Sequence, residues 1–197
     1  MIDLVRPNAI RVLSGHLVDP FELKQEDIPK IDFIHSISLL NRFTGHSKYP
    51  YSVGQHSYIL SLHVPKHLKK AAIIHDFSEA LFNDIASPVK ARFHDYRAHE
   101  ETAQKIIFEY FRVPWSDMDE LHEYDRRIFM DERNILFNNI EDEGKGRGDD
   151  MIALGIDPDY FKETEWRTVK TKLEAEFKWN FRNWITEAKS GKLVGQP

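Results

Sequence analysis

The segment AAIIHDFSEALFNDIASPVK, residues 71–90, decides how the chain is interpreted. Its aliphatic residues recur at the spacing of an apolar helix. The same stretch carries His75 next to Asp76, followed by Glu79 and Asp84. Burying imidazoles and carboxylates is strongly unfavourable unless they are paired or bind a metal ion. The four polar groups therefore form either a solvated helix face or a functional site.

The composition restricts the classes of protein that fit. The chain has 197 residues and is 41% hydrophobic, so we expect one domain, residues 1–197, with its own core. The absence of cysteine excludes disulfides, thiolate catalysis and cysteine-ligated metal sites. A net charge of −5 argues against a stable nucleic-acid partner. Since neither a signal peptide nor an apolar run of membrane-spanning length is evident, we expect a cytoplasmic protein that does not bind membranes.

The hydrophobic periodicity predicts an all-α fold, a compact helical bundle with a short irregular or extended N-terminus. Residues 1–25 are expected to form extended chain or one short hairpin. Asp27 is expected to cap the first helix, and Ser52 with Gln55 has the pattern of a capping box. Ser87 and Pro88 are expected to stop the third helix. The expected helices span about residues 27–40, 52–63, 66–82, 96–111, 116–140 and 164–189.

The remaining segments are loops and a C-terminal extension. The Gly-rich, charged residues 141–150 predict a mobile loop, and residues 41–50 predict another. The bundle core is expected at about 27–140, and a helical extension at about 160–190. Large apolar residues from Trp166 to Ile185 recur at helical spacing, which indicates packing or a subunit interface. We therefore expect a homo-oligomer, a dimer or higher.

Helical spacing places His75, Asp76 and Glu79 on one face. One helix cannot enclose a metal ion, so further ligands must come from other helices. His56 lies on the preceding helix, and Asp125 lies in register with apolar residues of a later one. Asp119 and Asp131 are the nearby alternatives to Asp125. Two imidazoles and two carboxylates suit one divalent cation (Mn, Co, Fe, Ni, Mg or Zn) with open positions for water, a site able to hydrolyse phosphate esters.

These residues carry a resemblance to a known family. The order H56…HD75–76…D125, with SEALFND, SPVK and the upstream NRFTGHSKYPYSVGQHS, resembles the HD-domain phosphohydrolase superfamily. The branch with the most similar motifs contains the bacterial YfbR-like 5′-deoxynucleotidases. In length and opening the chain is similar to the small phage-encoded dATP triphosphohydrolases. The resemblance covers roughly residues 10–140.

The resemblance implies a role for each matching position. His56, His75, Asp76 and Asp125 become metal ligands, and Glu79 becomes the acid/base that orients the attacking water. Asp84 would lie beside the reacting phosphate or sugar. The implied substrate-binding residues are Arg42 on the phosphate, Phe43 stacking on the base or sugar, and Lys90 as an added positive charge. The sequence has Phe43 where the deoxynucleotidases have Trp, which leaves base and sugar preference open. Candidate cations for a triphosphate tail are Lys48, Lys90, Arg92, Arg126 and Arg127.

The expected function is hydrolysis of the 5′-phosphate ester of a deoxynucleotide with one divalent cation. The first expectation is a dNTP triphosphohydrolase acting on dATP, which would release deoxynucleoside and triphosphate. The alternative is a 5′-nucleotidase that converts dNMP to deoxynucleoside and phosphate. A third hypothesis, from a different class, is a non-catalytic nucleotide-binding module with the same fold.

Overall fold

The computed structural model describes residues 8–138 and 151–183, and within them it confirms the all-α fold. Two two-residue strands, β1 (Ile10–Arg11) and β2 (Leu17–Val18), form the expected short hairpin with antiparallel pairing. The α-helices are α1 (Phe33–Leu39), α2 (Val53–His63), α3 (Lys69–Ile74), α4 (Glu79–Phe82), α5 (Ser87–Lys90), α6 (His94–Tyr110), α7 (Ser116–Leu136) and α8 (Trp166–Asn180). Short 3-10 segments are η1 (Pro20–Glu22), η2 (Gln25–Lys30), η3 (Phe43–Gly45), η4 (Lys66–Leu68) and η5 (Pro158–Lys162).

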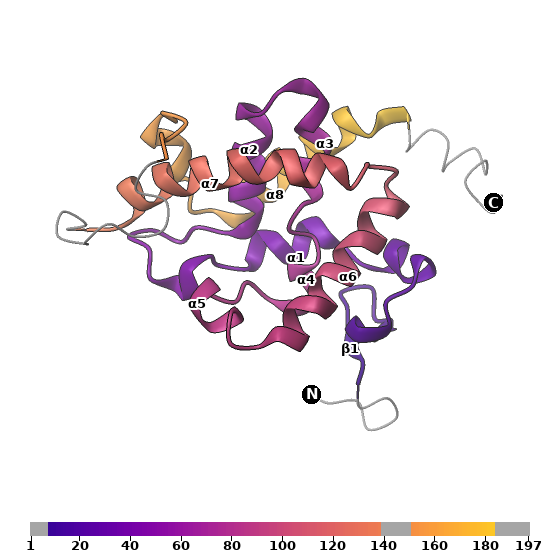
Figure 1. The fold of residues 1–197 in the computed structure, drawn as a ribbon. Helices are drawn as coiled ribbons and strands as arrows, with labels where there is room; N and C mark the ends of the chain where they lie inside the picture. Colours follow the sequence, from indigo (N-terminus) through magenta and orange to yellow (C-terminus); the bar gives the residue numbers. More distant parts are fainter. Residues whose placement is uncertain (1–7, 139–150, 184–197) are drawn as a thin grey trace.

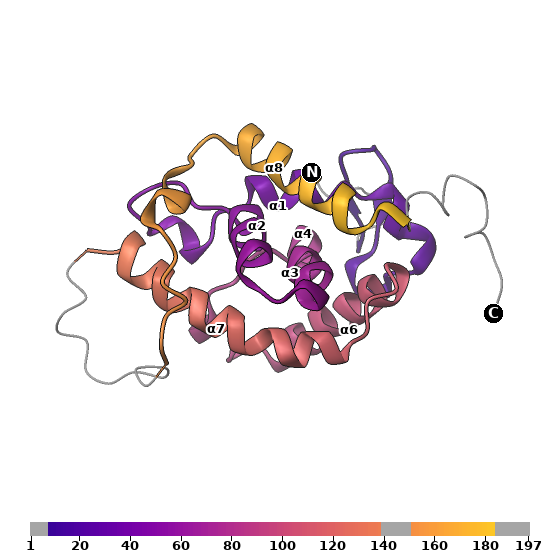
Figure 2. The same ribbon diagram turned by 90° about the horizontal axis from the view of Figure 1, so that it is seen from above.

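Helices α2 and α3 form the centre of the molecule (Figures 1 and 2). Helices α6 and α7 lie along one side of them, and α1 and α8 lie along the other. The apolar side chains of the central helices, such as Ile59 and Ile73, have no exposed surface. Polar groups carried by α2, or by the segment that follows α3, are therefore held in the interior. Among the described residues, no helix is both long and apolar enough to cross a membrane.

The start of α2 follows the expected capping pattern in part. Ser52 Oγ accepts a hydrogen bond from the Gln55 backbone N–H at 3.1 Å. The Gln55 side chain does not complete the capping box, because its amide donates to the Tyr160 carbonyl oxygen at 3.0 Å. Gly54 lets α2 approach α1 closely, since a Cβ atom there would lie 3.1 Å from the Ser38 Cα atom. The first turn of α2 is thus fixed against both α1 and η5.

The first expected helix, residues 27–40, is wrong in its start. Asp27 lies inside η2, which also contains Pro29. Its carboxylate accepts a hydrogen bond from the Lys24 backbone N–H at 3.2 Å. The backbone is extended at Ile31, and α1 begins after Asp32, whose carboxylate accepts from the His35 N–H at 3.0 Å. Pro29 would fall in the first turn of the expected helix, where no N–H is needed, so the break is at the extended Ile31 and not at the proline.

The expected helix 66–82 is divided into η4, α3, a turn and α4. Between α3 and α4 the backbone N–H groups of Phe77 and Glu79 bond to carbonyls three residues back rather than four. Ser87 and Pro88 were expected to stop the chain. Instead they begin α5, with Pro88 in a first-turn position where no N–H is needed. Although the helix is interrupted between them, the side chains of His75 and Glu79 are both buried.

The C-terminal expectations are met only within the described residues. Helix α7 ends at Leu136, and α8 buries Val169 and Leu173 while Trp179 remains 68% exposed. The expected loop 141–150, and the part of the final helix from Trp184 onward, lie outside the described residues. The single-domain division and the homo-oligomer stay predictions. Light scattering at micromolar concentration would test the second.

Candidate metal centre

Three elements bring the four expected ligands together. Helix α2 carries His56, the turn after α3 carries His75 and Asp76, and α7 carries Asp125. His56 Nε2 lies 3.2 Å from His75 Nε2 and 3.1 Å from Asp125 Oδ1. Asp76 Oδ2 lies 3.1 Å from His75 Nε2 and 3.9 Å from His56 Nε2. His56, His75 and Asp125 offer ligand atoms within 4.8 Å of one another and could hold a metal ion.

The protonation of the two imidazoles supports a cation between them. His75 Nδ1 lies 2.9 Å from the Ala72 carbonyl oxygen, which only accepts, so Nδ1 carries the proton. His56 Nδ1 lies 2.6 Å from Glu132 Oε1, a carboxylate, and is likewise a donor. Both Nε2 atoms, the positions left to bind a cation or a second proton, therefore face each other and the two acidic oxygens. Ligands bound at about 2.1 Å lie about 3 Å apart in adjacent positions, which these spacings match.

The electrostatics also favour positive charge at this point. Burial and the Arg42 guanidinium lower the pKa of His56, but the Glu132 and Asp125 carboxylates outweigh them and raise it to about 9. Burial raises the pKa of Asp125, but its hydrogen bond to His56 and nearby histidine charge lower it to about 2. For Asp76 the interaction with His75 outweighs burial, so its pKa is also low. In a protein without metal, a proton on an imidazole takes the place of the cation.

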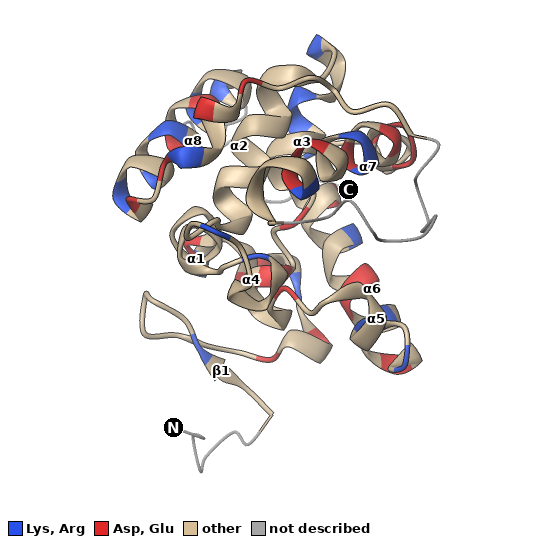
Figure 3. Cartoon of the chain, turned by 90° about the vertical axis from the view of Figure 1, so that its left-hand side faces the viewer, with Lys and Arg blue, Asp and Glu red and all other residues tan. Residues whose placement is uncertain are grey.

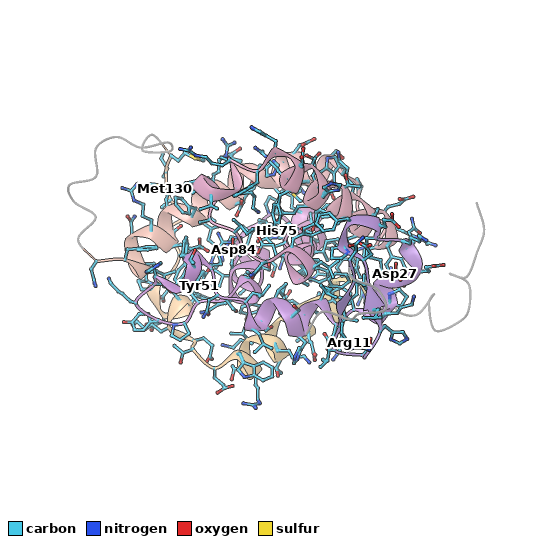
Figure 4. The ribbon with its side chains drawn as sticks, turned by 90° about the horizontal axis from the view of Figure 1, so that it is seen from below. Arg11, Asp27, Tyr51, His75, Asp84 and Met130 are labelled. Carbon is cyan, nitrogen blue, oxygen red and sulfur yellow. The ribbon has the colours of Figure 1, made fainter. Side chains whose placement is uncertain are left out.

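Glu79 lies beside the ligands and keeps one oxygen free. Its side chain is buried, and Oε2 has no hydrogen-bond partner. Burial raises its pKa well above the usual value, and the nearby Asp76 and Asp84 carboxylates raise it further. Burial also raises the pKa of the half-buried Asp84, whose carboxylate interacts with Arg42 and Asp76. Figure 4 labels Asp84 and His75. An acceptor poised in this way is suited to take or hold a proton.

Arg42 and Phe43 lie next to the cluster, but both side chains already contact other residues of the protein. The Arg42 guanidinium is 3.5 Å from Asp76 Oδ2 and 3.3 Å from Glu132 Oε2. Its side chain is only 14% exposed. Phe43 has φ of 57° and packs in an edge-on arrangement on Phe137, with ring centroids 5.1 Å apart. Arg42 is therefore placed to meet an anion at the metal centre, whereas much of the Phe43 ring already packs within the protein.

Lys90 lines a cleft of about 290 Å³ that also includes His75, Asp76 and Glu79. Its ammonium group forms an ion pair with Glu100 at 2.8 Å. Three other candidate cations donate to backbone carbonyl oxygens, Lys48 to Ile135, Arg126 to His122 and Arg127 to Ile152. Of the predicted cations, Arg42 is the one that the structure brings into contact with an expected metal ligand.

Sequence reasoning missed Glu132, which is buried beneath the cluster. It has no exposed surface and contacts His56, Tyr51 and Arg42. Its position seven residues after Asp125, on the same face of α7, was the available signal. The two alternatives to Asp125 lie elsewhere: the Asp131 carboxylate accepts from three backbone N–H groups at 154–156, and Asp119 is exposed.

The chain is similar to known proteins that have no stated activity. No family model matches the chain. It is similar to the uncharacterized protein YfdR of Escherichia coli, 34% identical over 105 residues that cover 53% of this chain and 59% of YfdR. An uncharacterized protein of Rhodobacter capsulatus is 30% identical over 90 residues, covering 41% of this chain and 46% of the relative. The chain thus spans about half the length of these curated relatives.

Proposed function

We propose that the chain is a metal-dependent phosphohydrolase of the HD-domain type that cleaves the 5′-phosphate ester of deoxynucleotides. The observation that carries the proposal is the convergence of His56, His75, Asp76 and Asp125 next to the unpartnered oxygen of Glu79. The two imidazoles of this cluster are buried and face carboxylate oxygens that remain partly accessible, which suits a metal ion that a substrate can reach. A polar cleft beside them provides room for a small substrate.

The residues of the chain divide the chemistry between them. A bound divalent ion would polarise a phosphoryl oxygen and make water more acidic. Glu79 accepts the proton of the attacking water, because its Oε2 is an unpartnered acceptor in the cleft that His75 and Asp76 also line. Arg42 turns its guanidinium toward the ligands and offsets charge that develops on the phosphoryl oxygens. The nucleoside 5′-oxygen leaves, and Asp84, in the same region, is positioned near the sugar or phosphate.

The length of the phosphate chain separates two candidate reactions. The resemblance favours a triphosphate, dATP first, with release of deoxynucleoside and triphosphate. The engagement of Lys90 with Glu100, and of Lys48 with a backbone carbonyl, favours a monophosphate, because fewer cations remain for a polyphosphate tail. A 5′-deoxynucleotidase is therefore kept as the second candidate.

The test is a panel of deoxy- and ribonucleotides, as mono- and triphosphates, with Mn²⁺ or Co²⁺ and with products separated by chromatography. The proposal predicts a deoxynucleoside product whose formation stops when the metal is removed by EDTA. Triphosphate as second product identifies the first candidate, and orthophosphate from dNMP identifies the second. Metal-dependent nucleotide binding without any turnover would contradict hydrolysis and support a non-catalytic binding module.

A further inference from the structure

Glu132 is a buried carboxylate that contacts two functional side chains at once. Oε1 lies 2.6 Å from His56 Nδ1 and 2.8 Å from the Tyr51 hydroxyl, and Oε2 lies 3.3 Å from Arg42 Nη2. Neither Glu132 nor His56 has an exposed side chain. Glu132 lies behind the ligands, since its partner on His56 is Nδ1 and not the Nε2 atom that faces the cluster.

We infer that Glu132 is a positioning residue for the metal centre. It holds the proton of His56 on Nδ1, so that Nε2 presents its lone pair to a cation. It also fixes the Arg42 guanidinium beside Asp76. The part that concerns His56 depends only on metal binding, whereas the part that concerns Arg42 rests on the proposed function.

The Glu132 carboxylate offers two acceptor oxygens to its neighbours. All three partners of Glu132 donate to it: the imidazole N–H, the tyrosine hydroxyl and the guanidinium. Glu132 contributes two oxygens and no proton when ionised. The three donors are therefore satisfied together only by an acceptor with two oxygens.

A glutamine at this position would break the pattern without changing the shape. Its NH₂ group must face a donor, either Arg42 on one side or His56 and Tyr51 on the other. If it faces His56, Nδ1 must accept, and the imidazole proton moves to Nε2, where it blocks ligation. If it faces Arg42, the guanidinium loses its partner and meets a second donor. His56 Nδ1 then bonds to a neutral amide oxygen, which makes Nε2 a weaker ligand than a carboxylate does. Changes to groups that orient metal ligands cost about 10–100-fold in affinity or activity.

The experiment measures the affinity of the metal-free protein for Zn²⁺ and Mn²⁺ by titration against a chelator, with no nucleotide present. Glu132→Gln is expected to bind about 10–100-fold more weakly. The matched control is Glu123→Gln, which removes a carboxylate from the same helix where the side chain is 67% exposed. A second control, Tyr51→Phe, removes a different donor to the same carboxylate. Both controls are expected to stay within about threefold of the unchanged protein.

The possible results divide clearly. A loss confined to Glu132→Gln, with circular dichroism and melting like those of the controls, supports the inference. Affinity within threefold of the unchanged protein overturns it. An equal loss in Tyr51→Phe also overturns it, since the effect would then belong to the whole buried network and not to the bond with His56.

If Glu132→Gln does not fold, two measurements keep the inference testable. In the Zn²⁺-loaded unchanged protein, NMR is expected to show the His56 imidazole proton on Nδ1 with slow solvent exchange. Glu132→Asp, which retains two acceptor oxygens, is expected to keep that proton on Nδ1. Ligation through Nδ1, or a proton found on Nε2, would overturn the inference. Because no nucleotide is needed, failure of the proposed hydrolysis and failure of this inference are separate outcomes.

Discussion

Charged groups in the interior and on the outer helices are held in different ways. On α6, Glu101 and Lys105 form an ion pair at 2.6 Å, yet about half of each side chain is exposed. Figure 3 shows positive and negative residues interspersed in this manner along α7 and α8. In the interior, His56 and Glu132 have no exposed side-chain surface and lie 2.6 Å apart, from His56 Nδ1 to Glu132 Oε1. Water solvates the surface pair whether or not it forms, but the buried groups must find their partners within the protein.

The difference between these regions indicates where function lies. A buried set of ionisable groups contributes little net stability, and replacing it by apolar residues is often neutral or favourable. Its presence in the centre of the molecule therefore points to a chemical role.

Glu79→Gln is expected to reduce turnover of the preferred nucleotide about 10²–10⁴-fold, because the amide cannot accept a proton from water. Metal affinity should stay within a few-fold, since Glu79 is not among the expected ligands. Steady-state kinetics and a metal titration on the same preparation make the comparison. A variant that keeps more than half of the original turnover would exclude Glu79 as the base.

Gly54→Ala tests how closely α2, the helix that carries His56, packs against α1. The added Cβ would lie 2.9 Å from Ser38 Oγ and 3.1 Å from the Ser38 backbone, so α1 and α2 must separate. The expected loss is about 1–3 kcal/mol in free energy of unfolding, measured by urea denaturation. Ser38→Gly in the same background removes the Oγ contact and should restore part of the loss. Unchanged stability in Gly54→Ala would show that the two helices do not meet this closely.

Metal affinity is expected to depend on pH through His56. In the metal-free protein its pKa is raised to about 9, so below that pH a proton competes with the metal. The apparent affinity should rise by up to about tenfold per pH unit and level off near pH 9, with proton release on binding. Calorimetry in buffers of different ionisation enthalpy measures that release. A flat affinity between pH 6 and 8 would contradict the charge state assigned to His56.

Glu101→Gln should have the smallest effect. Lys105 lowers the pKa of Glu101 by direct hydrogen bonding, but both side chains are about half exposed. Exposed helix pairs of this spacing contribute about 0.3–0.5 kcal/mol, so the melting temperature should hardly change. If Glu101→Gln lowered the free energy of unfolding by more than about 1 kcal/mol, surface and interior ion pairs would not differ as described.

The parts of the fold that depend on local chemistry were predictable from sequence. Ser52 could be identified as a cap because a hydroxyl beside a helical pattern satisfies a free N–H group, and its bond to Gln55 N–H confirms it. Asp27 fits the same pattern but lies inside the 3-10 segment η2, and the backbone becomes extended at Ile31 before α1 begins. The signal for a cap is local, whereas the length of the helix behind it depends on packing.

The candidate site was predictable to the extent that its residues follow a pattern along the chain. His56, His75, Asp76 and Asp125 could be proposed from spacing and resemblance, and the structure brings them together. Glu132 was missed, since its partners lie 76 and 81 residues away and only the fold places them in contact. The ion pair between Lys90 and Glu100 was hidden for the same reason.

The most direct test of the central claim is anomalous diffraction from crystals grown with excess Mn²⁺. The account predicts one strong peak bound by His56 Nε2, His75 Nε2 and the carboxylates of Asp76 and Asp125. The peak should weaken when the crystals are grown at lower pH, because a proton competes with the metal for His56. Absence of a peak at neutral pH, with these four side chains well ordered, would contradict the claim that they form a metal centre.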